Sequence, residues 1–336
     1  MTDCISEILD KSYAWNSGFI RFDMDNVLTT KWGKGTYNCI DAYTINATWN
    51  SFMHILTMNS SYTAYTAIRS NDKEITKGTI ILPNTATYST KYGFISLYNN
   101  ELFIGDSFKQ NKYWDEDTLL KLKEYINPNK NILEIGGHCG TSTVVYASFL
   151  NPGSKCFVYE PQKNMHKLLV QNIKQNNLED KISAFNKGVF CFNGKGAMND
   201  VTLDGGHSIV AKRYNEEKNL ACNFGGLCLG ADGESIDLTT VDSMNHDNIG
   251  YIHCDAQGSE NFIFSSSLLL INKCKPVILY ENNELHGQYL YNNVCAKYPE
   301  YKRQSKFNIK EYCMKVLGYS KCIERFNGSI DYLLLP

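Results

Sequence analysis

Acidic residues and glycines that follow short apolar stretches are the clearest candidates for chemistry in this chain. The apolar residues 132–135 lead into the glycine turn 136–140, and the apolar residues 156–159 lead into Glu160. Glycine has no Cβ, so it permits a sharp bend and the close approach of a ligand. A carboxylate about 20 residues past such a turn, at the end of the next strand, can accept hydrogen bonds from both hydroxyls of a ribose. This spacing predicts a site for a nucleoside.

The elements that must position these residues form one strand–helix–strand unit. Residues 132–135 and 156–159 are expected to be parallel strands, and residues 141–150, with hydroxyl side chains in the first turn, a helix between them. The N-terminus of that helix would point unpaired N–H groups at the ligand. The glycines do not follow the G-x-G-x-x-G order of a dinucleotide site, and Glu134 precedes them, which favours S-adenosylmethionine over NAD. A purely structural turn is the alternative, and Glu160 in register counts against it.

The rest of the second half alternates between expected helices and strands. We expect helices at 115–126, 162–176 and 259–271, and strands at 181–186, 249–255, 276–280 and, as an edge strand, 330–335. This alternation predicts an α/β fold with a doubly wound parallel sheet, whose ligands bind at the carboxyl ends of the strands. Asn186, Asp255 and Glu281 fall at those ends. The long glycine-rich segment 193–232 is expected to be a lid or a hairpin.

The first part of the chain has a different texture. Residues 1–105 contain short Thr-, Tyr- and Ile-rich stretches separated by Gly, Asn, Asp and Pro, which predicts a small β domain, either a sandwich or a barrel. Residues 106–130 would form a linker with a hinge helix, and residues 131–336 the α/β domain. Five side chains of the β domain could line a sugar-binding face, although core packing and turn positions explain them better. They are Trp32, Trp49, His54, Arg69 and Asp72.

The composition excludes some partners and predicts a compartment. The chain has 336 residues with 33 Lys and Arg against 35 Asp and Glu, so a nucleic-acid or anionic-membrane partner is not expected. The acidic start does not resemble a signal peptide, and the longest apolar run is too short to span a bilayer. The 12 cysteines lack zinc-type spacing, which predicts free thiols in a reducing cytoplasm. Frequent Asn, Lys, Tyr and Ile suggest an AT-rich genome, and for a large virus the compartment would be the host cytoplasm.

Four stretches of the second half resemble the FkbM family of class I S-adenosylmethionine-dependent methyltransferases. They are residues 132–141, residues 159–172, residues 240–243, and residues 255–260 with the strand that ends at 281. The fourth, Asp255-Ala256-Gln257-Gly258-Ser259-Glu260, is similar to the family's D-V-E/Q-G-x-E box. His138, Cys139 and Ala256 depart from the residues usual in the family. The resemblance covers about residues 111–336 and implies a Rossmann-like methyltransferase domain behind the small β domain.

By this resemblance, the glycine turn and the acids near it bind the cofactor. Glu134, Gly136 and Gly140 would shape the methionine pocket, Glu160 would bind the ribose, Asn186 would lie near the adenine, and Asp255 would face the methyl group. The full set expected to bind S-adenosylmethionine is Glu134, Gly136, Gly137, His138, Gly140, Thr141, Glu160, Pro161, Asn186 and Asp255. The family role implies an O-methyltransferase whose acceptor is a hydroxyl of a sugar or glycan.

Methyl transfer to an alcohol needs a base for the hydroxyl proton or a metal ion that binds the oxygen. Asp255 and the pair Glu281-Asn282 end neighbouring strands, and their oxygens could together hold Mg²⁺ or Mn²⁺. Alternatively, Asp255 orients the substrate and Glu281 caps a helix. His207 is the preferred histidine base, ahead of His286, whereas His253 is expected to pack in the core. The expected catalytic residues are thus Asp255, Glu281 and His207.

The role of the β domain has two readings. In the first, residues 1–105 hold the sugar or glycan acceptor, or form a homodimer that does. In the second, the methyltransferase fold is catalytically weak and the β domain serves as a glycan- or protein-binding module. A nucleic-acid methyltransferase is not expected, because the fourth strand leads into Asp255-Ala256-Gln257-Gly258 and not into a Pro-Pro-aromatic box.

Overall fold

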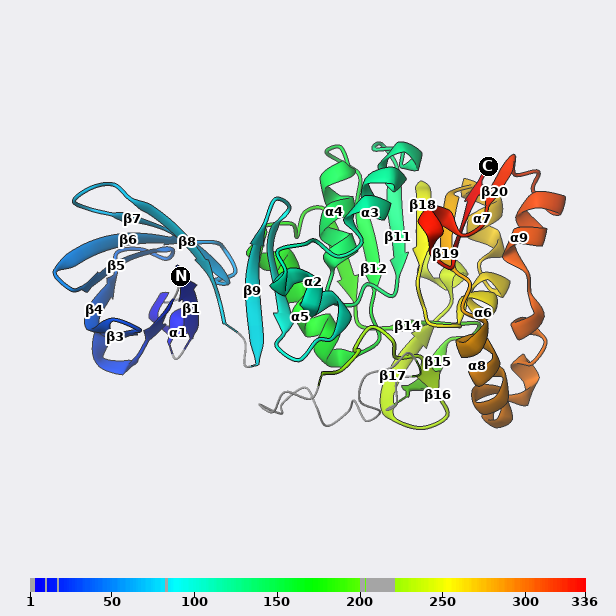
Figure 1. The fold of residues 1–336 in the computed structure, drawn as a ribbon, viewed down its shortest axis with the longest axis horizontal. Coiled ribbons are helices and arrows are strands. Elements are labelled where there is room, and N and C mark those ends of the chain that lie inside the picture. The colour runs from blue at the N-terminus through cyan, green and yellow to red at the C-terminus, as the bar shows by residue number, and fades with distance from the viewer. Residues whose placement is uncertain (1–3, 10, 17, 82–83, 200–202, 204–220) are drawn as a thin grey trace. The chain divides into compact units, whose positions relative to one another are not determined.

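The computed structural model describes residues 4–9, 11–16, 18–81, 84–199, 203 and 221–336. The chain divides into two compact units (Figure 1). One comprises Met1–Asn99 with Gln171–Leu178, and the other comprises Asn100–Val170 with Glu179–Pro336. Within the described ranges, every helix is too short or too polar to serve as a membrane span.

The first unit contains an antiparallel sheet in which each strand pairs with the next along the chain. Its strands are β1 (Ser12–Trp15), β2 (Gly18–Phe22), β3 (Val27–Thr30), β4 (Gly33–Cys39), β5 (Thr44–Trp49), β6 (Phe52–Met58), β7 (Ala64–Arg69) and β8 (Ile75–Thr79). The sheet closes on itself, because the N–H of Ile81 donates to the carbonyl of Ser12 (2.7 Å) and Tyr13 bridges to Ile80. The predicted small β domain is therefore a barrel.

Aromatic side chains fill the barrel. Tyr13, Trp15, Phe22 and Tyr37 are buried there, because alternate residues of each strand point inward. Trp49 and His54, two of the five candidates for a sugar-binding face, also lie in this interior, with their rings stacked at a centroid distance of 4.0 Å. Of the other three, Trp32 is 39% exposed, and Arg69 forms an ion pair with Asp72. The five side chains therefore do not form one face.

One disulfide corrects the sequence analysis. The short helix α1 (Cys4–Ile8) packs on the barrel core, and Cys4 is joined to Cys39 of β4. The prediction that all 12 cysteines are free is wrong for this pair, which the distribution of cysteines along the chain gave no reason to single out. The other ten form no disulfide in the described part of the chain.

A hairpin completes the first unit. Its strands are β9 (Thr85–Thr90) and β10 (Gly93–Tyr98). Asn172, at the end of helix α5 (Lys163–Gln175), accepts a hydrogen bond from the N–H of Ser96 (2.8 Å) and donates one to its carbonyl (3.0 Å). Gln175 donates to the carbonyl of Phe94 (2.8 Å). These bonds explain why residues 171–178 group with the N-terminal part of the chain.

A seven-stranded sheet forms the centre of the second unit. Its order is β13 (Ile182–Phe185), β12 (Cys156–Tyr159), β11 (Asn131–Ile135), β18 (Ile249–Cys254), β19 (Val277–Glu281), β21 (Asp331–Leu335) and β20 (Lys321–Ile323). The first five strands are parallel, and β21 runs antiparallel to both of its neighbours. This order with its reversed strand is the class I methyltransferase fold. The predicted edge position of 330–335 is wrong, because the short strand β20 pairs outside β21.

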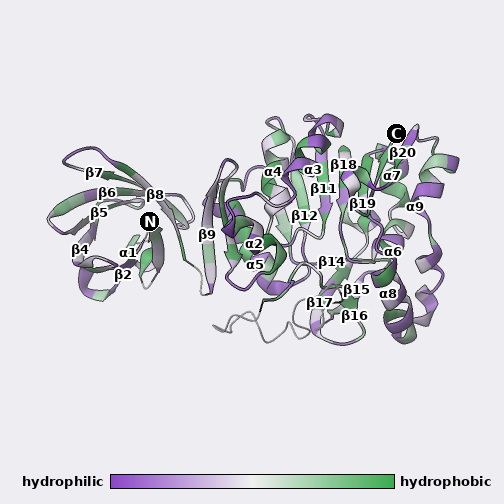
Figure 2. Ribbon diagram, in the orientation of Figure 1, coloured by the Kyte–Doolittle hydropathy of each residue, from purple (hydrophilic) through white to green (hydrophobic). Residues whose placement is uncertain are grey.

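Helices cover both faces of this sheet. They are α2 (Phe103–Lys109), α3 (Glu116–Leu122), α4 (Thr141–Phe149), α5, α6 (Glu260–Ser265), α7 (Leu268–Cys274), α8 (Glu284–Lys297) and α9 (Ile309–Glu311). Leu133, Ile252 and Ile278 pack with α6 and α7 on one face, while Glu134 and His253 point to the opposite face. Figure 2 shows hydrophobic residues along the strands and many hydrophilic ones on α8.

The helix expected at 259–271 is two helices. The hydroxyls of Ser266 and Ser267 donate to the carbonyl of Ile263, which competes with regular helical bonding. The carboxylate of Asp242 then accepts the N–H groups of Leu269 and Leu270 at the start of α7 (3.1 and 3.0 Å). A cap distant in sequence therefore begins the second helix.

A small second sheet lies beside the carboxyl ends of the main strands. It has the order β14 (Gly188–Val189), β17 (Glu234–Thr239), β15 (Gly194–Met198) and β16 (Leu229–Gly230). The described ends of the predicted lid or hairpin, 193–232, thus pair as β15 and β16. His207 lies outside the described residues.

Candidate functional site

The glycine turn between β11 and α4 is built for close packing. Gly136 has φ of +88°, and a Cβ there would lie 1.8 Å from the carbonyl oxygen of Asp255. A Cβ on Gly137 would lie 2.1 Å from the side chain of Val158. Gly140 has φ of +91° at the start of α4, next to Leu169. Side chains at these positions would collide with the protein itself, so the turn lies directly against its neighbours.

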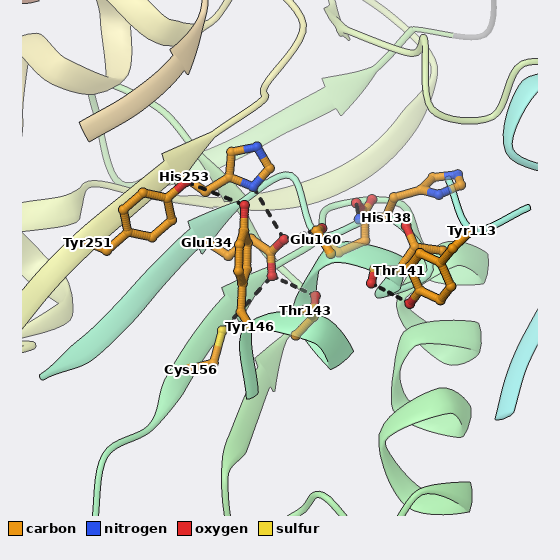
Figure 3. A network of polar contacts seen from close by, with 11 residues as sticks. Tyr113, Glu134, His138, Thr141, Thr143, Tyr146, Cys156, Glu160, Tyr251 and His253 are labelled. Atoms are coloured by element: carbon orange, nitrogen blue, oxygen red, sulfur yellow. Dashed lines mark hydrogen bonds and ion pairs between the residues drawn. The ribbon is translucent and has the colours of Figure 1, made fainter. Parts of the chain in front are cut away.

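Glu160 is held at the end of β12 by two main-chain N–H groups. The N–H of His138 donates to Oε2 (Figure 3), and the N–H of Gln162 donates to Oε1, both at 2.8 Å. The side chain is 3% exposed, and burial raises its pKa to about 7, although the two N–H groups oppose this. The carboxyl group is therefore fixed in orientation and titrates close to neutral pH.

A cavity of about 170 Å³ lies at the carboxyl ends of β11, β12 and β18. One end is mainly apolar, with Val189, Met198, Leu227 and Leu229. The other end is polar and is lined by Asp115, Ser142, His253, Asp255 and Asp331. Gly136, His138, Thr141, Glu160 and Pro161, all expected to bind the cofactor, line the same cavity.

Three aspartates face the polar end from different elements. Asp115 precedes α3, Asp255 follows β18, and Asp331 begins β21. Burial raises the pKa of Asp331 to about 6, and the charge of Asp255 adds to the shift. Gln257 donates a hydrogen bond to the carboxylate of Asp255 (2.7 Å). The polar end thus concentrates negative charge.

Four of the expected cofactor residues lie outside the lining of this cavity. Glu134 is fully buried beneath it, and its carboxylate accepts hydrogen bonds from Ser142 and Thr143 of α4 (2.5 and 2.6 Å). Asn186 donates to the carbonyls of Glu160 and Pro161 (2.9 and 3.0 Å), so it holds the chain that carries Glu160. The remaining two, Gly137 and Gly140, shape the turn.

Two of the expected catalytic residues, Asp255 and Glu281, line different cavities. Asp255 lines the cavity described above, whereas Glu281 and Asn282 line a second cavity with Glu260 and Asn283. Burial, with the charge of Asp255 next, raises the pKa of Glu281 to about 10. In the described part of the chain, no three His, Cys, Asp or Glu side chains are grouped to hold a metal ion. Use of Mg²⁺ or Mn²⁺ stays a prediction.

The structure places three functional candidates that the sequence analysis did not select. His253 lines the cavity, and so do Asp115 and Asp331. The pairing of His253 with Glu134 on adjacent strands could have been suspected, because both point to the same face in register. No sequence pattern marked Asp331 as a site residue. It reaches the carboxyl ends of the parallel strands only because β21, which it begins, runs in the reverse direction. His286 is fully buried, and its N–H donates to Asn283 at the start of α8.

Comparison with known proteins finds only distant structural similarity. No protein-family model matches the chain, and no curated protein does. Among solved structures, methyltransferase FkbM from Methylobacillus flagellatus KT is similar, with 12% identity, a TM-score of 0.39 and coverage of 62% of this chain. The chain spans 44% of that structure's length.

Two further solved structures are O-methyltransferases. The enzyme from Bacillus cereus, in complex with SAH, has 14% identity and a TM-score of 0.33 over 65% of this chain and 78% of its own. TomG from Streptomyces achromogenes, involved in tomaymycin synthesis and in complex with SAM, has 11% identity and a TM-score of 0.34 over 65% and 77%. At these values the fold assignment rests on the strand order and the reversed strand β21.

Proposed function

We propose that the chain is an S-adenosylmethionine-dependent O-methyltransferase that acts on a hydroxyl of a sugar or glycan. The observation that carries this proposal is Glu160, whose two oxygens are fixed by main-chain N–H groups beside the glycine turn. A carboxylate in this position suits the two hydroxyls of a ribose. The neighbouring apolar end of the cavity suits an adenine ring, and its polar end suits the cationic methionine part.

Binding of S-adenosylhomocysteine, measured by calorimetry, tests the cofactor. Replacing Glu160 by Gln removes a charged acceptor, so we expect affinity to fall about 10- to 100-fold. The exposed Glu179, changed to Gln, serves as the matched control. Unchanged affinity in Glu160→Gln, or tighter binding of NAD than of S-adenosylhomocysteine, would contradict the proposal.

The cavity supports an uncharged acceptor. Three aspartates border its polar end, and none of the described lining residues is Lys or Arg. An acceptor with a phosphate or carboxylate group would meet like charge there, whereas hydroxyls can donate hydrogen bonds to carboxylates. Trp114 lines the same cavity and offers an aromatic face for a sugar ring.

A matched pair of acceptors tests this part of the proposal. A methyl hexoside and its 6-phosphate differ only by the phosphate group. We expect release of S-adenosylhomocysteine with the neutral glycoside and not with the phosphate. Cofactor binding without turnover on any glycoside would favour the alternative, a methyltransferase-fold protein that works as a binding module.

A further inference from the structure

A buried carboxylate and a histidine from adjacent strands contact each other beneath the cavity. Glu134 of β11 and His253 of β18 are register partners, and Oε1 of Glu134 lies 3.4 Å from Nδ1 of His253 (Figure 3). Glu134 is fully buried, and hydrogen bonds from Ser142 and Thr143 also hold its carboxylate in place. The carboxylate is therefore a rigid acceptor for one ring nitrogen of the histidine.

The other ring nitrogen of His253 remains available to the cavity. The side chain is 16% exposed and lines the cavity, and no residue that the structure describes bonds to Nε2. The Tyr146 ring and the imidazole pack in a T-shaped arrangement at a centroid distance of 5.6 Å. With Nδ1–H donated to Glu134, the neutral ring carries its lone pair on Nε2.

We propose that His253 is the catalytic base of the methyl transfer and that Glu134 is its positioning residue. The inference rests on the proposed function, in which S-adenosylmethionine supplies the methyl group. The O–H bond of the acceptor breaks and its proton passes to Nε2 of His253. The oxygen electron pair forms the new O–CH3 bond, and the pair of the broken S–CH3 bond stays on sulfur.

The surroundings suit an imidazole that must become cationic. An alcohol is a weak nucleophile until a base takes its proton. The groups that face His253 are Glu134 of β11, Tyr146 of α4, Asp115 before α3, Asp255 after β18 and Asp331 of β21. Burial lowers the pKa of His253, but the hydrogen bond and charge of Glu134, with Asp255 and Asp331, outweigh it and raise the pKa. The carboxylates therefore stabilise the imidazolium that proton transfer creates.

Nuclear magnetic resonance of the histidine rings tests the pairing in the full-length chain without ligands. The His253 signals are assigned from a His253→Gln spectrum. We expect the neutral ring to carry its proton on Nδ1 and its pKa to fall in Glu134→Gln. A proton on Nε2, or the same pKa in wild type and Glu134→Gln, would overturn the inference without reference to turnover.

Turnover with a panel of methyl glycosides tests the chemical role. We expect His253→Gln to lower kcat about 100-fold or more while S-adenosylhomocysteine affinity changes little. Glu134→Gln should lower kcat less and move the rising limb of the pH profile to lower pH. His166→Gln, on α5 and away from the cavity, should behave as wild type. Wild-type turnover in His253→Gln overturns this inference alone, whereas a chain that binds no S-adenosylhomocysteine overturns the proposed function as well.

Discussion

At the scale of single residues, burial keeps protonated a carboxyl group that lies beside His138, one of the residues that line the cavity. Glu101 is 1% exposed, and burial raises its pKa to about 8. Its Oε2 lies 3.7 Å from Nε2 of His138, whose pKa burial lowers to about 4. At neutral pH both groups are therefore uncharged, and the pair costs stability as soon as either must ionise.

We expect Glu101→Gln to stabilise the protein at alkaline pH. The folded-state pKa of Glu101 lies above its ordinary value, so its favourable contribution is complete in acid and is lost as pH rises toward about 8. Gln has the same shape and does not ionise, so the gain should be near zero in acid and on the order of 3 kcal/mol near the upper pKa. Urea unfolding at several pH values measures it. A gain that does not depend on pH would contradict the assignment, and Glu124→Gln on the surface is the control.

We expect Glu160 to make the affinity for S-adenosylhomocysteine depend on pH. Its pKa is raised to about 7 by burial, and only the ionised form is a strong acceptor for ribose hydroxyls. Affinity for S-adenosylhomocysteine should therefore increase as pH rises through about 7 and then level off. Calorimetry across this range checks the sign. The dependence should vanish in Glu160→Gln, and its persistence there would assign it to another group.

At the scale of elements, two glycines distinguish the two reasons for which a turn requires glycine: a positive φ, and a lack of space for a Cβ. Gly136 and Gly153 both have positive φ, +88° and +94°, but only a Cβ at Gly136 would meet another atom within 4 Å. Gly153→Ala should cost roughly 1–2 kcal/mol of unfolding free energy from backbone strain. Gly136→Ala adds a collision with the carbonyl of Asp255, so we expect a larger loss. Equal losses in thermal unfolding would show that the turn relaxes.

Local sequence patterns predicted the helices and strands that carry the site, whereas contacts with other segments determined the break between α6 and α7 and the position of β21. The strand at 131–135, the helix after Gly140 and the strand that ends at Tyr159 are confirmed, since apolar runs and glycines mark their ends. The break between α6 and α7 depends on Asp242, and the inner position of β21 depends on β20. Asp242 lies far from α7 in sequence, and β20, although close to β21 along the chain, is only three residues long, so no periodic pattern could reveal either.

The residues of the candidate site also differ in how well the sequence predicted them. Glu160 and the glycines were predictable because a strand–helix–strand unit of this length brings the glycine turn next to the end of the following strand. His253 looked like a core residue, because its alternation along β18 says which face it occupies but not that this face opens into a cavity. His207, the preferred base, lies outside the described residues and stays a prediction.

At the scale of the whole molecule, the point of truncation should decide the stability of a chain that lacks the barrel. The hairpin β9–β10 hydrogen-bonds Asn172 and Gln175, and Glu101 bridges to Cys222. A chain of residues 84–336 keeps these bonds, whereas 106–336 loses them. We expect the shorter chain to unfold at clearly lower temperature and the longer one to keep its S-adenosylhomocysteine affinity. Equal melting temperatures would contradict this dependence.

Truncation also tests the prediction that residues 1–105 hold the acceptor. Removing residues 1–83 deletes the barrel and leaves the hairpin in place. A large rise in acceptor KM with unchanged S-adenosylhomocysteine affinity would support acceptor binding by the barrel. Full-rate methylation by residues 84–336 would make the barrel dispensable for the reaction.

The closure of the barrel has a consequence for the behaviour of the chain in a crowded solution. An open sheet ends in a row of unpaired N–H and C=O groups that can recruit a strand from another molecule. Strands β1 to β8 pair in sequence, and the bonds of Tyr13 with Ile80 and of Ser12 with Ile81 join the two ends. Substitutions that break this seam, and not those on the barrel's outer loops, should therefore expose unpaired strand edges and promote fibril formation.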